Sequence, residues 1–224
     1  MKRILIPANS AEDWKALLAD PGKQWKRGYS ARTLAFCWQE AKGFPRSVRD
    51  VFRRSEVFRD IEILVAIPEH QVPLKGGVRP SQNDIWVLAR CGNQLVSIAV
   101  EGKVDEPFGP TLKEWGTSTG KEQRIRFICN ELGLDDPLPD DIRYQLLHRT
   151  ASAVLEAKRF NANHAVMLVH SFSRNDQWFE DYRRFVALFG GSAMMNQVTT
   201  GRTLRSGISL SFAWVQGEKR YLNL

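Results

Sequence analysis

The chain has 224 residues, of which 43% are hydrophobic and 25% charged, so long disorder, collagen and disulfide-rich scaffolds are excluded. Its formal net charge is +7 and its pI is about 9.5, which favours polyanionic partners such as nucleic acid. We expect one domain over residues 1–224, large enough to fold without disulfides.

The first 57 residues are expected to form an N-terminal helical part. Ser10, followed by two acids, has the features of a helix start, and Ser30 is expected to cap a helix over residues 31–41. Apolar side chains recur every three or four residues along that second helix. A short basic helix is expected over residues 46–56.

The middle of the chain, residues 58–172, is expected to hold the core of the domain. A β-branched run over residues 61–67 predicts a strand. Two further strands, residues 84–90 and 94–101, flank Gly92-Asn93, a dipeptide typical of two-residue hairpin turns. Three more elements are expected in this part: helices over residues 121–132 and 140–160, and a buried strand over residues 164–172.

The C-terminal part, residues 173–224, is expected to add a helix over residues 175–189 and closing strands over residues 207–215 and 219–222. The order of elements predicts a mixed α/β domain of the α+β kind, in which helices flank a central mixed sheet.

Cysteine usage and hydropathy point to the cytoplasm. Cys37, Cys91 and Cys129 are odd in number and far apart in sequence, as expected in a reducing compartment. The apolar run at residues 4–6 is too short for a signal-peptide core, and the run at residues 165–169 is far too short to span a membrane.

The predicted hairpin gathers three charged side chains. If Gly92-Asn93 form the turn, Asp84 lies opposite Glu101, and strand alternation puts Lys103 on the same face. Two carboxylates about 5 Å apart repel by roughly 3 kcal/mol at an effective dielectric near 20. A divalent cation would turn that repulsion into binding, and Mg²⁺ favours one or two carboxylates with water and phosphate oxygens. The alternative is a surface hairpin whose acids are neutralised by Lys103.

Asp84, followed seventeen residues later by Glu101-x-Lys103, resembles the PD-(D/E)xK motif of the restriction-endonuclease-like nuclease superfamily. The expected order of a helix, a three-strand meander, a helix and a strand over residues 30–172 is also similar to the core of that fold. The sequence departs from the motif at Asn83, where a proline is usual.

The resemblance implies a metal-dependent nuclease acting on nucleic acid, DNA in the first place, with no membrane partner. Asp84 and Glu101 would be the ligands of Mg²⁺ or Mn²⁺, and Lys103 the catalytic lysine. Cleavage of both strands would favour a homodimer. A domain of the same fold that binds nucleic acid or protein without cleaving is the alternative, and a coincidental motif is a third possibility.

The resemblance also implies further catalytic side chains from two helices. An acid often comes from the first core helix, where Glu40 is the candidate and Glu69 the reserve. The helix after the motif often adds polar groups, and Gln145, His148 and Arg149 share one helical face. Gln145 and His148 are catalytic candidates and Arg149 a nucleic-acid contact, whereas a solvated helix end and a solvated face are the alternatives.

Two basic stretches are candidate phosphate contacts. Arg46, Arg49 and Arg53 recur along one expected helix, and Arg202 and Arg205 lie in a glycine-bounded loop, although ordinary solvated surfaces explain both stretches as well. Residues 116–121 only superficially resemble a phosphate-binding loop, because the spacing is one residue short.

Overall fold

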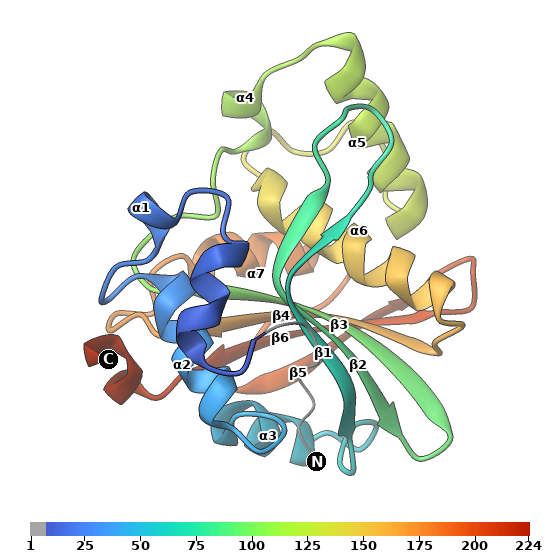
Figure 1. Ribbon diagram of the computed structural model, residues 1–224. Coiled ribbons are helices and arrows are strands. Elements are labelled where there is room, and N and C mark those ends of the chain that lie inside the picture. The colour runs from blue at the N-terminus through green and yellow to red at the C-terminus, as the bar shows by residue number, and fades with distance from the viewer. Residues whose placement is uncertain (1–7) are drawn as a thin grey trace.

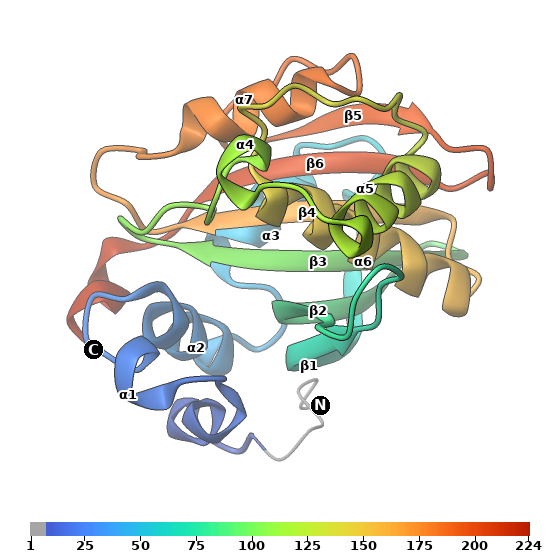
Figure 2. The same cartoon turned by 90° about the horizontal axis from the view of Figure 1, so that it is seen from above.

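The computed structural model describes residues 8–224, which contain a six-stranded mixed sheet between two layers of helices (Figure 1). The strand order is β1-β2-β3-β4-β6-β5, as Figure 2 shows. β1 to β3 form an antiparallel meander, β4 and β6 continue it in parallel, and β5 closes the edge antiparallel to β6. The strands are β1 (Glu62–Val72), β2 (Ser81–Cys91), β3 (Gln94–Lys103), β4 (His164–Ser171), β5 (Gln197–Thr203) and β6 (Ser209–Gln216).

Helices cover both faces of the sheet, which confirms the predicted mixed α/β class (Figure 1). On one face lie α2 (Ser30–Glu40) and α3 (Arg46–Arg53). On the other lie α5 (Thr119–Leu132), α6 (Tyr144–Arg159) and α7 (Phe179–Ala187). Four short elements complete the described chain: η1 (Ala11–Leu17), α1 (Pro21–Gln24), α4 (Leu112–Trp115) and η2 (Lys219–Asn223).

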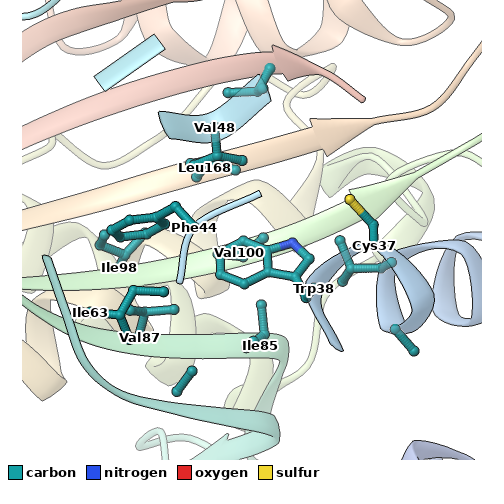
Figure 3. Packing of buried hydrophobic residues seen from close by; sticks show 14 of the residues in the cluster. Cys37, Trp38, Phe44, Val48, Ile63, Ile85, Val87, Ile98, Val100 and Leu168 are labelled. Carbon is teal, nitrogen blue, oxygen red and sulfur yellow. The ribbon is translucent and has the colours of Figure 1, made fainter. Parts of the chain in front are cut away.

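The face under α2 and α3 is wholly apolar at its centre. Figure 3 shows the Trp38 side chain of α2 among strand side chains that include Ile85 and Val100. Because strand side chains alternate between faces, these residues define the side of β2 and β3 that α2 covers. The same alternation sends Asp84, Glu101 and Lys103 to the opposite face, toward α6.

The face under α6 is apolar over most of its area and polar near one end. Leu146, Leu147 and Val154 of α6 pack in one cluster with the strand residues Ala99 and Met167. Some of its buried polar groups are paired, as where Trp86 donates its indole N–H to Ser97 Oγ at 2.9 Å. A well-packed helix therefore holds the polar end of this face in a fixed position.

Two predicted helices begin later than expected. The helix expected from residue 140 begins at Tyr144, because the residues before it bond to residues 111–113, as in Leu112 N–H to the Ile142 carbonyl at 2.9 Å. The helix expected from residue 175 begins at Phe179, because Asp176 and Trp178 adopt positive φ angles of 51° and 70°.

The C-terminal prediction was partly wrong. Residues 219–222 form the 3₁₀ turn η2 beside α2, and the antiparallel partner of β6 is β5, which was not predicted. β5 is an edge strand without buried residues, so it lacks the apolar alternation that marks a strand in sequence. Ser30 is the first residue of α2, and the cap is Tyr29.

Cysteines and hydropathy complete the description. Cys37, Cys91 and Cys129 are all free thiols. None of the helices between residues 8 and 224 combines the length and apolar character needed to cross a bilayer. The apolar run at residues 4–6 lies outside the described residues.

His170 is a buried polar side chain on the face of the sheet under α2, and both of its ring nitrogens have partners. Its ring is fully buried, and Nδ1 accepts the indole N–H of Trp38 at 3.2 Å while Nε2 lies 3.1 Å from Ser47 Oγ. These contacts give His170 a structural role. A proton on Nδ1 would oppose the Trp38 donor, and burial lowers the pKa of His170 to about 3.

We expect stability to fall in acid because of His170. The unfolded chain binds a proton at this histidine below pH 6.5 and the folded chain does not, so the contribution present at neutral pH is lost as the pH falls toward 3. The loss reaches about 2–3 kcal/mol at pH 4.5. Urea unfolding at pH 7 and 4.5 should show that the free energy of unfolding falls less for His170→Gln than for the wild type. An equal drop would contradict this assignment.

Candidate active site

The two motif strands separate where their charged residues lie. The register of the hairpin is the predicted one, with Cys91 opposite Gln94, and its ladder ends at the Ile85–Val100 pair. Beyond that pair β2 continues along β1, and β3 continues along β4 as far as Lys103. We call this point the fork.

Asp84 lies at the fork on the β2 side. Its Oδ2 accepts the backbone N–H of Gly102 at 2.7 Å, a donor that a continued ladder would have given to strand β2. The side chain stays 19% exposed. Asp84 is therefore anchored through one oxygen, while its second oxygen faces the rest of the site.

Glu101 is the most heavily bonded side chain at the fork. Its Oε1 accepts Lys103 Nζ and Gln145 Nε2, both at 2.7 Å, and its Oε2 accepts Arg149 Nε at 2.6 Å. The predicted placement of Lys103 on the face of Glu101 and the predicted reach of Gln145 are both confirmed. Glu101 and Lys103 are only 2% and 3% exposed, so the pair is isolated from bulk water.

Arg149 of α6 links the two acids. Besides its bond to Glu101, its Nη2 lies 3.9 Å from Asp84 Oδ1, and its Nη1 donates to Ser81 Oγ at 3.4 Å. Gln145 and Arg149 are one turn apart on α6, which is why both reach the same carboxylate. The expectation that Arg149 contacts nucleic acid does not fit this placement, since the buried guanidinium is already bound to Glu101.

A third carboxylate, Glu69 of β1, lies beside Asp84 at the fork. The β1–β2 register brackets it between the pairs Pro68–Ile85 and His70–Asn83, which puts Glu69 opposite Asp84. Its Oε2 accepts Gln82 Nε2 at 2.7 Å. Its φ is +52°, a strained value that non-glycine residues adopt mainly where surrounding contacts hold them.

The pKa values of the three carboxyls at the fork are shifted in different directions. Burial, followed by repulsion from Glu101, raises the pKa of Asp84 to about 7. Burial, followed by repulsion from Asp84, raises the pKa of Glu69 to about 8. Burial also acts on Glu101, but Lys103 and Arg149 outweigh it and lower its pKa. Perturbations of this kind are typical of functional sites.

The donor chemistry of the fork fits a hard divalent cation. Its acids offer only oxygen, the ligand atom that Mg²⁺ and Mn²⁺ prefer, and Mg²⁺ is commonly held by one or two carboxylates with water and phosphate. Between residues 8 and 224, no three His, Cys, Asp or Glu side chains converge as a complete metal site. Asp84 and Glu101 would hold the ion, and Arg149 would have to release Glu101 Oε2.

His148 lies one contact away from the acids. Its Nδ1 is 2.8 Å from Ser81 Oγ, the same oxygen that Arg149 approaches, and the ring does not bond to Glu101. Burial and the neighbouring cations, Arg149 first, lower its pKa well below the usual value, so the imidazole is neutral. His148 is thus placed to position Arg149 through Ser81.

Glu40 lies elsewhere, contrary to the first-choice prediction. Its carboxylate is half exposed and accepts Arg220 Nη2 at 2.9 Å, which ties the end of α2 to η2. The reserve candidate, Glu69, is the acid that joins Asp84. Glu40 is excluded because the fork faces α6, whereas α2 packs on the opposite side of the sheet.

The predicted basic stretches do not surround the fork. Arg46, Arg49 and Arg53 belong to α3, which packs on the opposite face of the sheet. Arg202 donates to the carbonyl oxygens of Gly133 and Leu188, so it holds loops together, and Arg205 lies beside it. These side chains form two separate surfaces away from the carboxylates.

The loop between β1 and β2, residues 73–80, borders the site and is fastened by Arg124 of α5. The buried guanidinium donates to the carbonyl oxygens of Leu74, Gly77 and Arg79. The loop backbone also touches α5, since a Cβ on Gly76 would lie 2.4 Å from Arg124 N. Only glycine fits here, because φ is also +84°.

We expect Gly76→Ala to lower the free energy of unfolding by at least about 2 kcal/mol more than Gly109→Ala. Both glycines have positive φ, but nothing lies within 4 Å of a Cβ on Gly109, so the difference isolates the contact with α5. Urea denaturation of the two variants measures it. Equal losses would mean that the loop is not held against α5.

Comparison with known proteins places the chain in one family. No curated protein and no solved structure matches it. The family model DUF6946, described as a domain of unknown function, matches residues 7–219. The chain therefore belongs to the DUF6946 family.

Proposed function

We propose that this protein is a metal-dependent nuclease that hydrolyses phosphodiester bonds of DNA. The observation that carries the proposal is the fork, where Asp84, Glu101 and Lys103 meet on one face of two diverging strands. The raised pKa values of Asp84 and Glu69 add to it, because carboxyls with perturbed pKa values are typical of functional sites.

The topology supports the same proposal. The order of α2, the β1–β2–β3 meander, the α5–α6 pair and the parallel strand β4 agrees with the core implied by the PD-(D/E)xK resemblance. The motif residues occupy the two central strands of that unit, and α6 adds Gln145 and Arg149 from above.

Each residue at the fork has a role in the proposed reaction. Asp84 and Glu101 would hold Mg²⁺ or Mn²⁺, which supplies Lewis acidity and a water of lowered pKa when bound. Lys103, held by Glu101 at 2.7 Å, would orient the attacking water and stabilise developing negative charge. Gln145 fixes the orientation of Glu101, and Glu69 keeps Asp84 in an acidic environment.

The setting of the reaction is part of the proposal. Three free cysteines fit a reducing cytoplasm. The net charge of +7 favours a polyanionic substrate. Cleavage of both strands of a duplex would require two copies of the chain.

One observation favours a second candidate, a domain that binds nucleic acid without cleaving it. Both oxygens of Glu101 are taken by Lys103, Gln145 and Arg149, so in this arrangement cationic side chains already balance the carboxylate. In that case metal would not bind, and the fork would be a structural ion-pair network.

Thermal melting in EDTA and in Mn²⁺, beside a cleavage assay on single-stranded and duplex DNA, separates the two candidates. The nuclease is expected to melt several degrees higher in Mn²⁺, because an ion bound only by the folded state stabilises it, and to cut at least one substrate. An unchanged melting temperature together with intact substrates would leave the binding domain.

A further inference from the structure

A cavity of about 480 Å³ adjoins the fork between the β1–β2 loop, α5 and α6. Figure 1 shows this loop rising from the sheet beside α5. Its wall includes three basic side chains, Arg79, Lys121 and Arg124, and three aromatic rings. No aspartate or glutamate of the described chain lines it. The cavity is therefore suited to an anionic ligand with a planar group.

Trp115 and Tyr144 are stacked on each other, and the His148 ring is tilted by 49° against Tyr144. Trp115 and Tyr144 lie 3.9 Å apart between ring centroids and 14° from parallel, and His148 lies 4.7 Å from Tyr144. Lys121 Nζ lies 5.1 Å from the centroid of Trp115. Rings held parallel in this way present flat surfaces already ordered before binding, which lowers the entropy lost when another planar group packs on them.

The cations differ in what they can offer a ligand. Arg124 is buried and its donors are taken by loop carbonyls, so it contributes charge more than hydrogen bonds. Arg79 is exposed at the rim of the cavity. Lys121 already donates to the carbonyl oxygen of Trp115. Arg79 is thus the group placed to bond a phosphate, and Lys121 adds positive charge beside it.

The cavity shares a wall with the fork. Ser81 and His148 line the cavity and are hydrogen-bonded to each other at 2.8 Å. Ser81 also accepts from Arg149, which holds Glu101. A strand whose phosphate reaches the carboxylates would therefore bring a neighbouring nucleotide to this cavity.

We propose that the cavity binds one unpaired nucleotide of the substrate, with its base against the Trp115–Tyr144 stack and its phosphate near Arg79 and Lys121. Paired bases inside a duplex present no free face for stacking, so the site selects single-stranded DNA. This inference rests on the proposed nuclease function and names its substrate class. A small anionic metabolite is the competing occupant.

The test is binding without cleavage, measured by fluorescence anisotropy in EDTA with a labelled single strand of about 12 nucleotides and the matching duplex. The wild type is expected to bind the single strand about tenfold more tightly. Trp115→Leu should weaken single-strand binding about tenfold and change duplex binding less than about twofold, whereas Trp115→Phe should retain most of the affinity.

Arg79→Gln serves if Trp115→Leu does not fold, since Arg79 is exposed, and Arg59→Gln is its matched control outside the cavity. Arg79→Gln should weaken single-strand binding severalfold, and Arg59→Gln should not. Any of three results would overturn the inference. Trp115→Leu could weaken binding of both DNA forms equally, or the two arginine variants could have equal effects. Mononucleotides could also bind in competition although no oligonucleotide binds.

The readout separates this inference from the proposed function. Single-strand binding that depends on Trp115, in a protein that never cuts DNA, would support the cavity assignment and refute the nuclease. Metal-dependent cleavage with no preference for single strands and no effect of Trp115→Leu would support the nuclease and refute the cavity assignment.

Discussion

Lys103→Met is expected to lower the rate of DNA cleavage by about 10²- to 10³-fold while DNA affinity in EDTA stays within about twofold. The size is that expected for removing a charged group whose proposed role is to stabilise the transition state in a water-poor site. Affinity should persist, since one ammonium is a small part of a phosphate interface with many contacts. Single-turnover cleavage in Mg²⁺ measures the rate, and anisotropy measures the affinity.

Methionine keeps the packing that alanine would remove. Lys103 Nζ lies over the Phe108 ring at 5.0 Å, and the buried side chain fills space beside it. Glu101 loses one partner in this variant but keeps Gln145 and Arg149. Lys113→Met, at an exposed lysine, is the matched control and should cleave at the wild-type rate. A Lys103→Met protein that cleaves normally would remove lysine from the mechanism.

Local signals explain why the motif hairpin was predictable from the sequence. A two-residue turn sets the register of the strands that flank it, so Gly92-Asn93 was enough to predict the pairing as far as Ile85 opposite Val100, one residue short of Asp84 and Glu101. Helical spacing was similarly enough to predict that Gln145 and Arg149 project together from α6. In both cases the relevant contacts are between residues close in sequence or joined by one tight turn.

The rest of the site depends on contacts that no local pattern encodes. Glu69 meets Asp84 through a loop of eight residues, 73–80, whose path is set by Arg124 of α5 and by the close approach of the loop residue Gly76 to that helix. The role of Arg149 was misjudged because helical spacing shows which face a side chain is on, but not whether a carboxylate or solvent lies opposite. Glu40 was chosen for its place on the first core helix, and the sheet separates that helix from the fork.

The arrangement at the fork ties fold stability to the proposed activity. Three carboxylates cross β1, β2 and β3 side by side, and the two cations beside them, Lys103 and Arg149, are both bound to Glu101. Asp84 and Glu69 are left with raised pKa values, which means that ionising them costs folding free energy. Such a site is more stable when one of these acids is neutral.

Asp84→Asn is therefore expected to stabilise the metal-free protein at pH 8 by about 2–4 kcal/mol and to abolish metal-dependent cleavage. The pKa of Asp84 rises from 3.8 in the unfolded chain to about 7 on folding, through burial and then Glu101. Its contribution to stability is thus present below about pH 4 and is lost as the pH rises through 7. Asparagine removes that loss and still offers an oxygen to the Gly102 N–H.

Urea unfolding in EDTA across pH 5 to 8 measures the effect, with Asp60→Asn, at an exposed aspartate, as the matched control. The stability difference between Asp84→Asn and the wild type should be smaller at pH 5 than at pH 8, whereas Asp60→Asn should follow the wild type throughout. In Mn²⁺ the order should reverse, because only the wild type keeps both carboxylates for the ion. A variant that is less stable than the wild type in EDTA at pH 8 would make Asp84 part of a structural ion pair with Arg149, since breaking such a pair weakens the fold.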